Sequence, residues 1–145
     1  MEQVPNLNEE TIKLTGKDID NRVFNMTFNR LCQHQFADPK LAYNIGFIAK
    51  KVQAFTKDIM MEHGKLLDKY AQKNDEGNFD LDDNKNVQVP DDKKNDYKND
   101  LDSVHEIEIE IRKKRLDVDV LSQNGFTFAA NDISVLEPLL CGLED

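Results

Sequence analysis

The clearest pattern in the chain is a stripe of apolar residues between positions 41 and 59. Asp38 followed by Pro39 is a typical helix start, because Asp caps free N–H groups and Pro needs no N–H at the first helical position. The stripe then repeats in steps of four and three residues, the period of one helix face, through Leu41, Ile45, Ile48, Val52, Phe55 and Ile59. His63, Leu66 and Tyr70 extend it, so the pattern predicts one core helix over 39–73.

A helix of that length would exceed the body that should cover it. At 1.5 Å per residue it would be about 50 Å long, whereas a domain of this size is about 40 Å across. Either the helix breaks at Gly64, or it protrudes and needs a partner. Tyr97, Leu101 and Val104 have the spacing of a partner helix, which Asp91 or Asp92 would cap. We therefore predict a helical hairpin over about 39–105 with a polar tip, in which Tyr70 lies near Tyr97 or Leu101.

Shorter patterns surround this hairpin. Residues 11–14 alternate as a strand does, and Thr15 with Asp18 has capping-box spacing, which predicts a helix that ends near His34. Near the other end, Ser134 and Glu137 share that spacing and predict a short terminal helix that stops at Gly142. The first ten residues carry no such pattern, and we expect them to be a flexible N-terminus.

The segment 106–121 alternates with period two on both sides of a basic turn, Arg112 to Arg115. This predicts a β-hairpin in which Ile111 faces Leu116. The same register sets Glu110 opposite Asp117 and Glu108 opposite Asp119, which are unfavourable like-charge pairs. Together the patterns predict a single α+β domain over 11–145. Its parts are a long helical hairpin, a small antiparallel sheet formed by the β-hairpin and the N-terminal strand, and a short C-terminal helix.

Composition fits one globular domain. The chain has 145 residues, of which 39% are hydrophobic and 32% charged. Its apolar runs fall far short of the roughly 20 residues that cross a bilayer, and the acidic start MEQVPNLNEE lacks the features of a signal peptide. We therefore expect no membrane association. Cys32 and Cys141 stand in apolar surroundings, which favours buried thiols of a reducing compartment over a disulfide.

The net charge of −9 is concentrated in residues 75–110. This segment holds thirteen acidic residues against four lysines, which accounts for the whole imbalance of the chain. Such a segment repels phosphates, so we expect no direct binding to nucleic acid. It is either a solvated face or a surface for a basic partner. If it is a solvated face, neutralising Asp96, Asp100, Glu108 and Glu110 should relieve repulsion and stabilise the isolated protein slightly.

Motifs for chemistry are sparse. The chain has no Gly-rich phosphate loop, serine elbow, His-Glu-x-x-His or Cys-x-x-Cys, which favours a non-enzymatic protein without cofactor or metal. With Gly77 at the sixth position of a calcium loop, Gln72 and Asp83 would be the first and twelfth ligands, and neither fits. Cys32 and His34 lack further zinc ligands at suitable spacing. The basic turn either binds phosphate or an acidic segment of another copy, or is an ordinary charged turn.

The order of these segments is similar to that of a known family. The runs IKLTGKDI, LAYNIGFIAKKVQAFTKDI, LLDKYAQKNDEGNFDL and ISVLEPLL resemble a family of short uncharacterised tailed-bacteriophage proteins of siphovirus type. The resemblance covers most of residues 11–141. The chain departs from it in a longer, more acidic tip after Asn78 and a more basic turn. Because no activity is established for that family, the resemblance implies a phage origin and no residue roles.

Three classes of function follow. The first is a phage protein that acts by protein–protein contact, as a minor virion or assembly component, in the cytoplasm of the infected host and in the virion. Its partners would be other phage structural proteins, a host protein or a second copy. The second is an acidic inhibitor that occupies the nucleic-acid-binding surface of a host protein, and the third is an unrecognised hydrolase or metal enzyme. The candidate contact residues are Asp96, Asp100, Glu106, Glu108, Glu110, Arg112, Lys113, Lys114 and Arg115.

Overall fold

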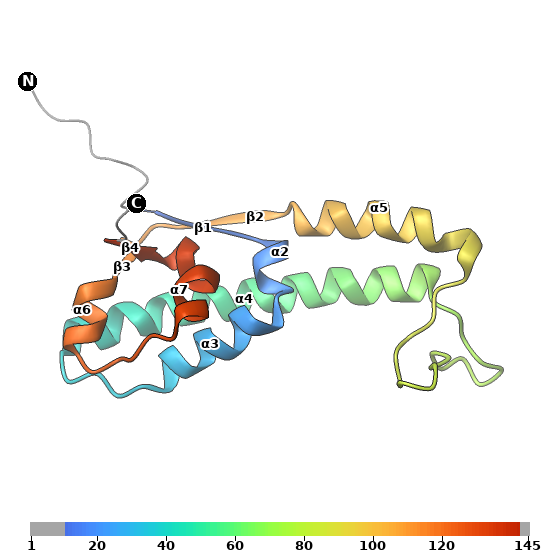
Figure 1. Cartoon of the computed structure of the whole chain (residues 1–145). Helices are drawn as coiled ribbons and strands as arrows, with labels where there is room; N and C mark the ends of the chain where they lie inside the picture. Colours follow the sequence, from blue (N-terminus) through green and yellow to red (C-terminus); the bar gives the residue numbers. More distant parts are fainter. Residues whose placement is uncertain (1–10, 143–145) are drawn as a thin grey trace, which may run out of the picture.

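The structure is a computed structural model that describes residues 11–142, and the expectation for residues 1–10 lies outside it. It is a mixed α+β fold built along one long helix, as predicted (Figure 1). Along the chain, the elements are β1 (Ile12–Thr15), α2 (Gly16–Ile19), α3 (Arg22–Gln33), α4 (Pro39–Tyr70), the 3-10 turn η1 (Asp91–Lys93), α5 (Lys94–His105), β2 (Glu108–Ile111), β3 (Leu116–Asp117), α6 (Val118–Gln123), α7 (Ala130–Leu136), the 3-10 turn η2 (Glu137–Leu139) and β4 (Leu140–Cys141).

The 32-residue helix α4 is the spine of the molecule. Asp38 caps it as predicted, since its Oδ1 accepts a hydrogen bond from the Lys40 N–H at 3.0 Å. All six residues of the apolar stripe between 41 and 59 are buried. The break considered at Gly64 is wrong, because the helix continues through that residue without interruption to Tyr70. At 1.5 Å per residue, α4 is about 48 Å long.

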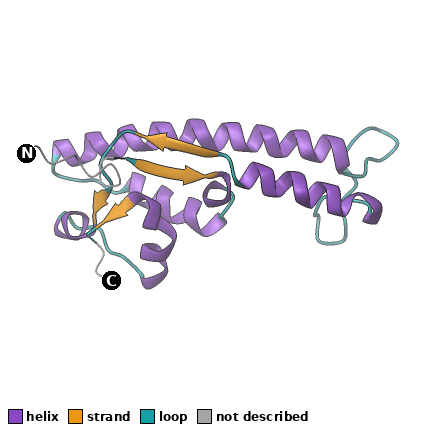
Figure 2. Ribbon diagram, turned by 90° about the horizontal axis from the view of Figure 1, so that it is seen from above, coloured by secondary structure: helices purple, strands orange, loops and turns teal. Residues whose placement is uncertain are grey.

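The second arm of the helical hairpin, α5, lies beside the distal half of α4 (Figures 1 and 2). The predicted contact is confirmed, since the rings of Tyr70 and Tyr97 meet edge to face at 6.0 Å between centroids. The prediction that Asp91 or Asp92 caps the returning helix is wrong, because Pro90 is the N-cap of η1 and no side chain caps it. Asp91 instead pairs with Lys94 Nζ at 2.7 Å.

The predicted β-hairpin over 106–121 is wrong. Strand β2 pairs antiparallel with β1, so that Ile111 lies opposite Ile12, and β3 pairs parallel with β4, so that Leu116 lies opposite Leu140. The cause is Asp117. Its Oδ1 accepts hydrogen bonds from the backbone N–H groups of Asp119 and Val120 at 2.9 and 3.1 Å and thereby starts helix α6.

This topology removes the predicted like-charge pairs. Glu110 lies opposite Lys13, and Glu108 lies opposite Thr15. The cross-strand neighbour of Glu110 is therefore a cation, which is a favourable pair.

The predicted helix at the N-terminal end is split in two. Thr15 and Asp18 form the expected capping box at the start of α2. Helix α2 ends after one turn, and Asn21 caps α3 by accepting from the Val23 N–H at 2.9 Å. The predicted cap of the terminal helix at Ser134 is wrong, because α7 begins at Ala130 and Asp132 accepts from the Ala129 N–H at 2.7 Å.

The prediction that Gly142 ends the terminal helix is wrong. Gly142 follows strand β4 rather than a helix, and its φ of +78° is a left-handed value that favours glycine. Cys32 and Cys141 are half-buried and are not bonded to each other.

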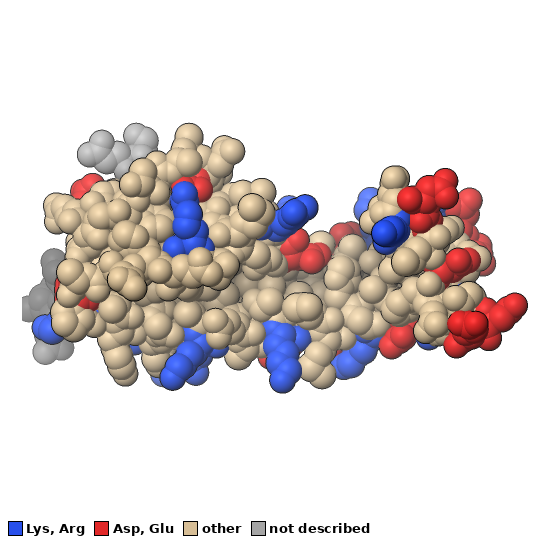
Figure 3. Space-filling view, turned by 90° about the horizontal axis from the view of Figure 1, so that it is seen from below, with Lys and Arg blue, Asp and Glu red and all other residues tan. Residues whose placement is uncertain are grey.

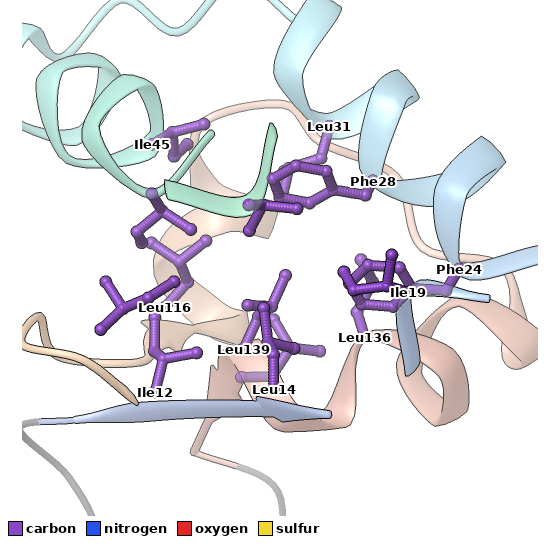
Figure 4. Close-up of a cluster of buried hydrophobic side chains, with 14 of the residues drawn as sticks. Ile12, Leu14, Ile19, Phe24, Phe28, Leu31, Ile45, Leu116, Leu136 and Leu139 are labelled. Atoms are coloured by element: carbon purple, nitrogen blue, oxygen red, sulfur yellow. The ribbon is translucent and has the colours of Figure 1, made fainter. Parts of the chain in front are cut away.

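The core lies in the half of the molecule that contains α3, both strand pairs, α6 and α7, which we call the body. It surrounds the N-terminal half of α4. Side chains from α3, α4, β1, β3 and the C-terminal segment point toward one another there (Figure 4). Figure 2 shows both strand pairs in this half, whereas the distal half of α4 is accompanied by α5 and the tip. Among residues 11–142, no helix is both long and apolar enough to cross a membrane.

Truncation of Phe55 tests the buried stripe. Its side chain is 3% exposed, so Phe55→Ala should lower the free energy of unfolding by about 3 to 5 kcal/mol in a urea titration. Tyr43, which is 69% exposed on the same helix, is the control, and Tyr43→Ala should cost less than about 1 kcal/mol. Equal losses for the two variants would show that the stripe does not form the core.

Candidate functional site: the acidic tip

The tip that joins α4 to α5 contains two turns of the same construction. Asn74 Oδ1 accepts hydrogen bonds from the N–H groups of Glu76 and Asn78, both at 3.0 Å. Eight residues later, Asp82 Oδ1 accepts from the N–H groups of Asn84 and Asn86, both at 2.9 Å. Each turn is thus held by one side chain that satisfies two backbone donors.

The equivalence extends to the backbone. Gly77 and Lys85 occupy matching positions, and both adopt left-handed conformations, with φ of +82° and +64°. A sequence signal for this exists in retrospect: Asn-Asp-Glu-Gly-Asn-Phe at 74–79 matches Asp-Asp-Asn-Lys-Asn-Val at 82–87. The prediction of a single polar tip did not include this eight-residue repeat.

A ring of backbone hydrogen bonds closes the tip at the base of the two turns. The Gln72 N–H donates to the Gln88 carbonyl at 2.8 Å, and the Asp80 N–H donates to the Gln72 carbonyl at 2.8 Å. The Gln88 N–H completes the ring by donating to the Asp80 carbonyl at 3.2 Å. Both turns therefore project from one hydrogen-bonded junction and not from an open loop.

Carboxylates gather on this frame. Figure 3 shows acidic side chains concentrated at the tip end of the molecule, while Lys and Arg side chains are spread along the body. The exposed acids of the two turns and of η1 are Asp75, Glu76, Asp82, Asp83, Asp91 and Asp92.

Two of the candidate residues lie on α5, and they differ in their contacts. Asp96 is exposed in the first turn. Asp100 is half-buried, accepts a 2.5 Å hydrogen bond from the Tyr70 hydroxyl and lies 3.6 Å from Lys69 Nζ. That hydrogen bond raises the pKa of Tyr70. Asp100 therefore holds the two helices of the hairpin together.

The remaining acidic candidates follow α5. Glu106 is the C-cap of that helix, and Glu108 and Glu110 lie on β2. All three side chains are exposed. Glu110 is opposite Lys13 in the strand register, so its cross-strand neighbour is a cation and not the acid that the sequence predicted.

The four basic candidates form the turn after β2, in the body. Arg112 and Lys114 are exposed, whereas Lys113 Nζ lies over the rings of Phe47 and Tyr43, at 4.9 and 5.7 Å from their centroids. Arg115 is half-buried, and its Nε finds no hydrogen-bond partner among residues 11–142. The nine candidates are thus not brought together as one site: the acids are spread along α5 and β2, and the basic turn follows β2 in the body.

A polar cluster that the sequence did not reveal lies where the hairpin leaves the body. Asp20 Oδ2 lies 2.8 Å from His105 Nε2, and Asp20 Oδ1 lies 4.0 Å from His63 Nδ1. The Tyr97 hydroxyl lies 3.4 Å from His63 Nε2, and burial, with the charge of Asp20, raises the pKa of Tyr97. These contacts join α2 to both helices of the hairpin. No local spacing in the sequence predicts these contacts, because the four residues come from three distant segments.

In the calcium loop considered with Gly77 at the sixth position, Asn74 would be the third residue, and its Oδ1 already accepts hydrogen bonds from two backbone N–H groups. Within the described residues, no group of three or more His, Cys, Asp or Glu side chains is placed to hold a metal ion.

Comparison with known protein families, curated proteins and solved structures finds no match to this chain.

Because of these contacts, neutralising the acidic side chains should not have one common effect on the stability of the protein. Asp100→Asn weakens the hydrogen bond to Tyr70, so it should lower the urea midpoint of unfolding, whereas Asp96→Asn should leave the midpoint unchanged or slightly raised. Glu110→Gln should also destabilise at low salt, because it removes a negative charge from the position directly opposite Lys13. Stabilisation by all three substitutions would instead support the solvated, self-repelling face.

Proposed function

We propose that this chain is a bacteriophage protein that acts through protein–protein contacts, as a minor virion or assembly component, and that the acidic tip is its contact surface. The observation that carries the proposal is the construction of the tip. Two backbone-fixed turns display exposed carboxylates at the far end of the hairpin, where α4 and α5 hold them away from the body. The phage origin rests on the resemblance described above.

A fixed carboxylate surface suits a basic protein partner. Because the side chains that shape the turns are held by backbone N–H groups, less conformational entropy is lost when a partner binds. Charge complementarity then increases the association rate and selects against acidic partners. The proposed partner is therefore a positively charged surface of another phage protein or of a host protein.

One observation supports the acidic inhibitor as a second candidate. Acids recur from the tip along α5 and β2 at Asp92, Asp96, Asp100, Glu106, Glu108 and Glu110. Four residues of helix, as from Asp96 to Asp100, and two residues of strand, as from Glu108 to Glu110, both advance about 6 to 7 Å, which is close to the spacing of successive phosphates in a nucleic-acid strand; the step from Asp100 to Glu106 is longer. Such an edge would fit the nucleic-acid groove of a host protein.

A tip variant tests the contact proposal. The variant Asp75→Asn, Glu76→Gln, Asp83→Asn removes three exposed acids of the turns without touching Asn74 or Asp82. The control variant Asp58→Asn, Asp119→Asn, Glu137→Gln removes three exposed acids from α4 and the body. Both should fold with free energies of unfolding within about 1 kcal/mol of the parent protein.

The readout is the number of copies of each variant in particles purified from cells infected with the phage that encodes the chain. We expect the parent and control to be incorporated and the tip variant to be reduced at least tenfold. If the chain is absent from particles but is retained on a basic host nucleic-acid-binding protein, with affinity that falls as salt rises, the inhibitor proposal replaces the first. Equal behaviour of tip and control variants in both assays would reject the tip as a contact surface.

A further inference from the structure

An apolar groove runs between α3 and α4, on the body and away from the acidic tip. It encloses about 520 Å³, and its lining includes Phe28 and Cys32 from α3 and Val52, Thr56, Met60 and Met61 from α4. Phe28 and Val52 are buried and form its floor. Burial raises the pKa of Cys32 to about 11, so its thiol is neutral and part of the apolar surface.

The edges of the groove expose large apolar side chains. Met60 and Met61, which line the groove from α4, are 68% and 55% exposed. Exposed methionines side by side with an open apolar groove are uncommon on a surface that faces only water, and they mark sites of interaction.

The shape of the groove matches a helix. The lining residues span positions 25–32 on α3 and 52–61 on α4, which correspond to about 10 and 13 Å along the two helix axes. An amphipathic helix places apolar side chains at i, i+4 and i+7 over about 10 Å, so three such anchors fit this length. Methionine side chains adapt their shape to such anchors.

The charged side chains around the groove indicate which kind of partner would bind there. Lys57 is the charged side chain among the lining residues of the described chain. Lys50 lies three positions before the lining residue Gln53 and seven, or two helical turns, before Lys57. Arg22 lies three positions before the lining residue Asn25, so cations share the helix faces that form both rims. In a chain with a net charge of −9, this rim is locally positive.

A basic rim disfavours a second copy of the chain in this groove. A two-fold contact would set the same face against itself and bring the cations of the two rims together. A helix with acidic residues beside its apolar face would instead pair with those cations. We propose that the α3–α4 groove is a docking site for an acidic amphipathic helix of a partner protein. This inference does not depend on the proposed role of the tip.

Two synthetic 18-residue helical peptides test the proposal. They share one apolar face of leucines at i, i+4 and i+7, and differ in the residues beside that face, which are glutamates in one peptide and lysines in the other. Binding of each fluorescein-labelled peptide to the full chain is followed by fluorescence anisotropy. We expect the glutamate peptide to bind at least tenfold more tightly than the lysine peptide, and this preference to shrink as salt rises.

Variants at exposed positions locate the binding. The double variant Met60→Ser, Met61→Ser should weaken the glutamate peptide at least tenfold, whereas Tyr43→Ser, which removes an exposed apolar side chain elsewhere on α4, should not. Lys57→Glu should reduce the preference for glutamate. Circular dichroism should show that all variants retain the parent helix content.

Three results would overturn the proposal. They are failure of the glutamate peptide to bind, equal binding of the two peptides, and binding that the Met60, Met61 double variant leaves unchanged. Sedimentation of the chain alone tests whether a second copy occupies the groove instead. A dimer that the same double variant dissociates would assign the groove to a second copy.

Discussion

The apolar stripe of α4 is longer than the body that covers it, and the rest of the structure follows from this mismatch. Burial of the stripe up to Ile59 builds the core with α3, the sheets and the C-terminal segment. Beyond Ile59 the helix continues for about three turns to Tyr70, and only a second helix can cover its apolar side there. Helix α5 supplies that cover through Tyr97, which contacts Tyr70 and His63, and the chain between the two helices becomes the tip.

The place where the hairpin leaves the body is fixed by close packing. A Cβ at Gly16 would lie 2.2 Å from the Val104 carbonyl oxygen, so a glycine is required where α2 meets the end of α5. The Gly16 N–H donates to the Ile107 carbonyl at 2.8 Å, and Asp20 contacts His105 and His63 just beyond. Together these contacts connect strand, short helix and hairpin, so the direction of the tip is set by the core.

Local patterns were sufficient for the long helix α4 and for two helix caps, and insufficient for the sheets and the shorter helices. The stripe of α4 and the caps at Asp38 and Thr15 are short-range features, and the structure confirms them. The β-hairpin failed because alternation at Leu116, Val118 and Val120 does not reveal that Asp117 starts a helix, and β2 finds its partner β1 almost a hundred residues away. Likewise, the sequence located the excess of acids but not the contacts of Asp100 and Glu110, which come from distant segments.

Helix α4 is one uninterrupted helix, so it carries the tip on the same rigid element as the core. Hydrogen exchange of the backbone amides over residues 60–68, on both sides of Gly64, tests this continuity. We expect protection that continues from Met60 through Gly64 to Asp68, because every amide there donates within the helix. Rapid exchange that begins at Gly64 and extends toward Tyr70 would show that the helix breaks and that the tip is not held by the core.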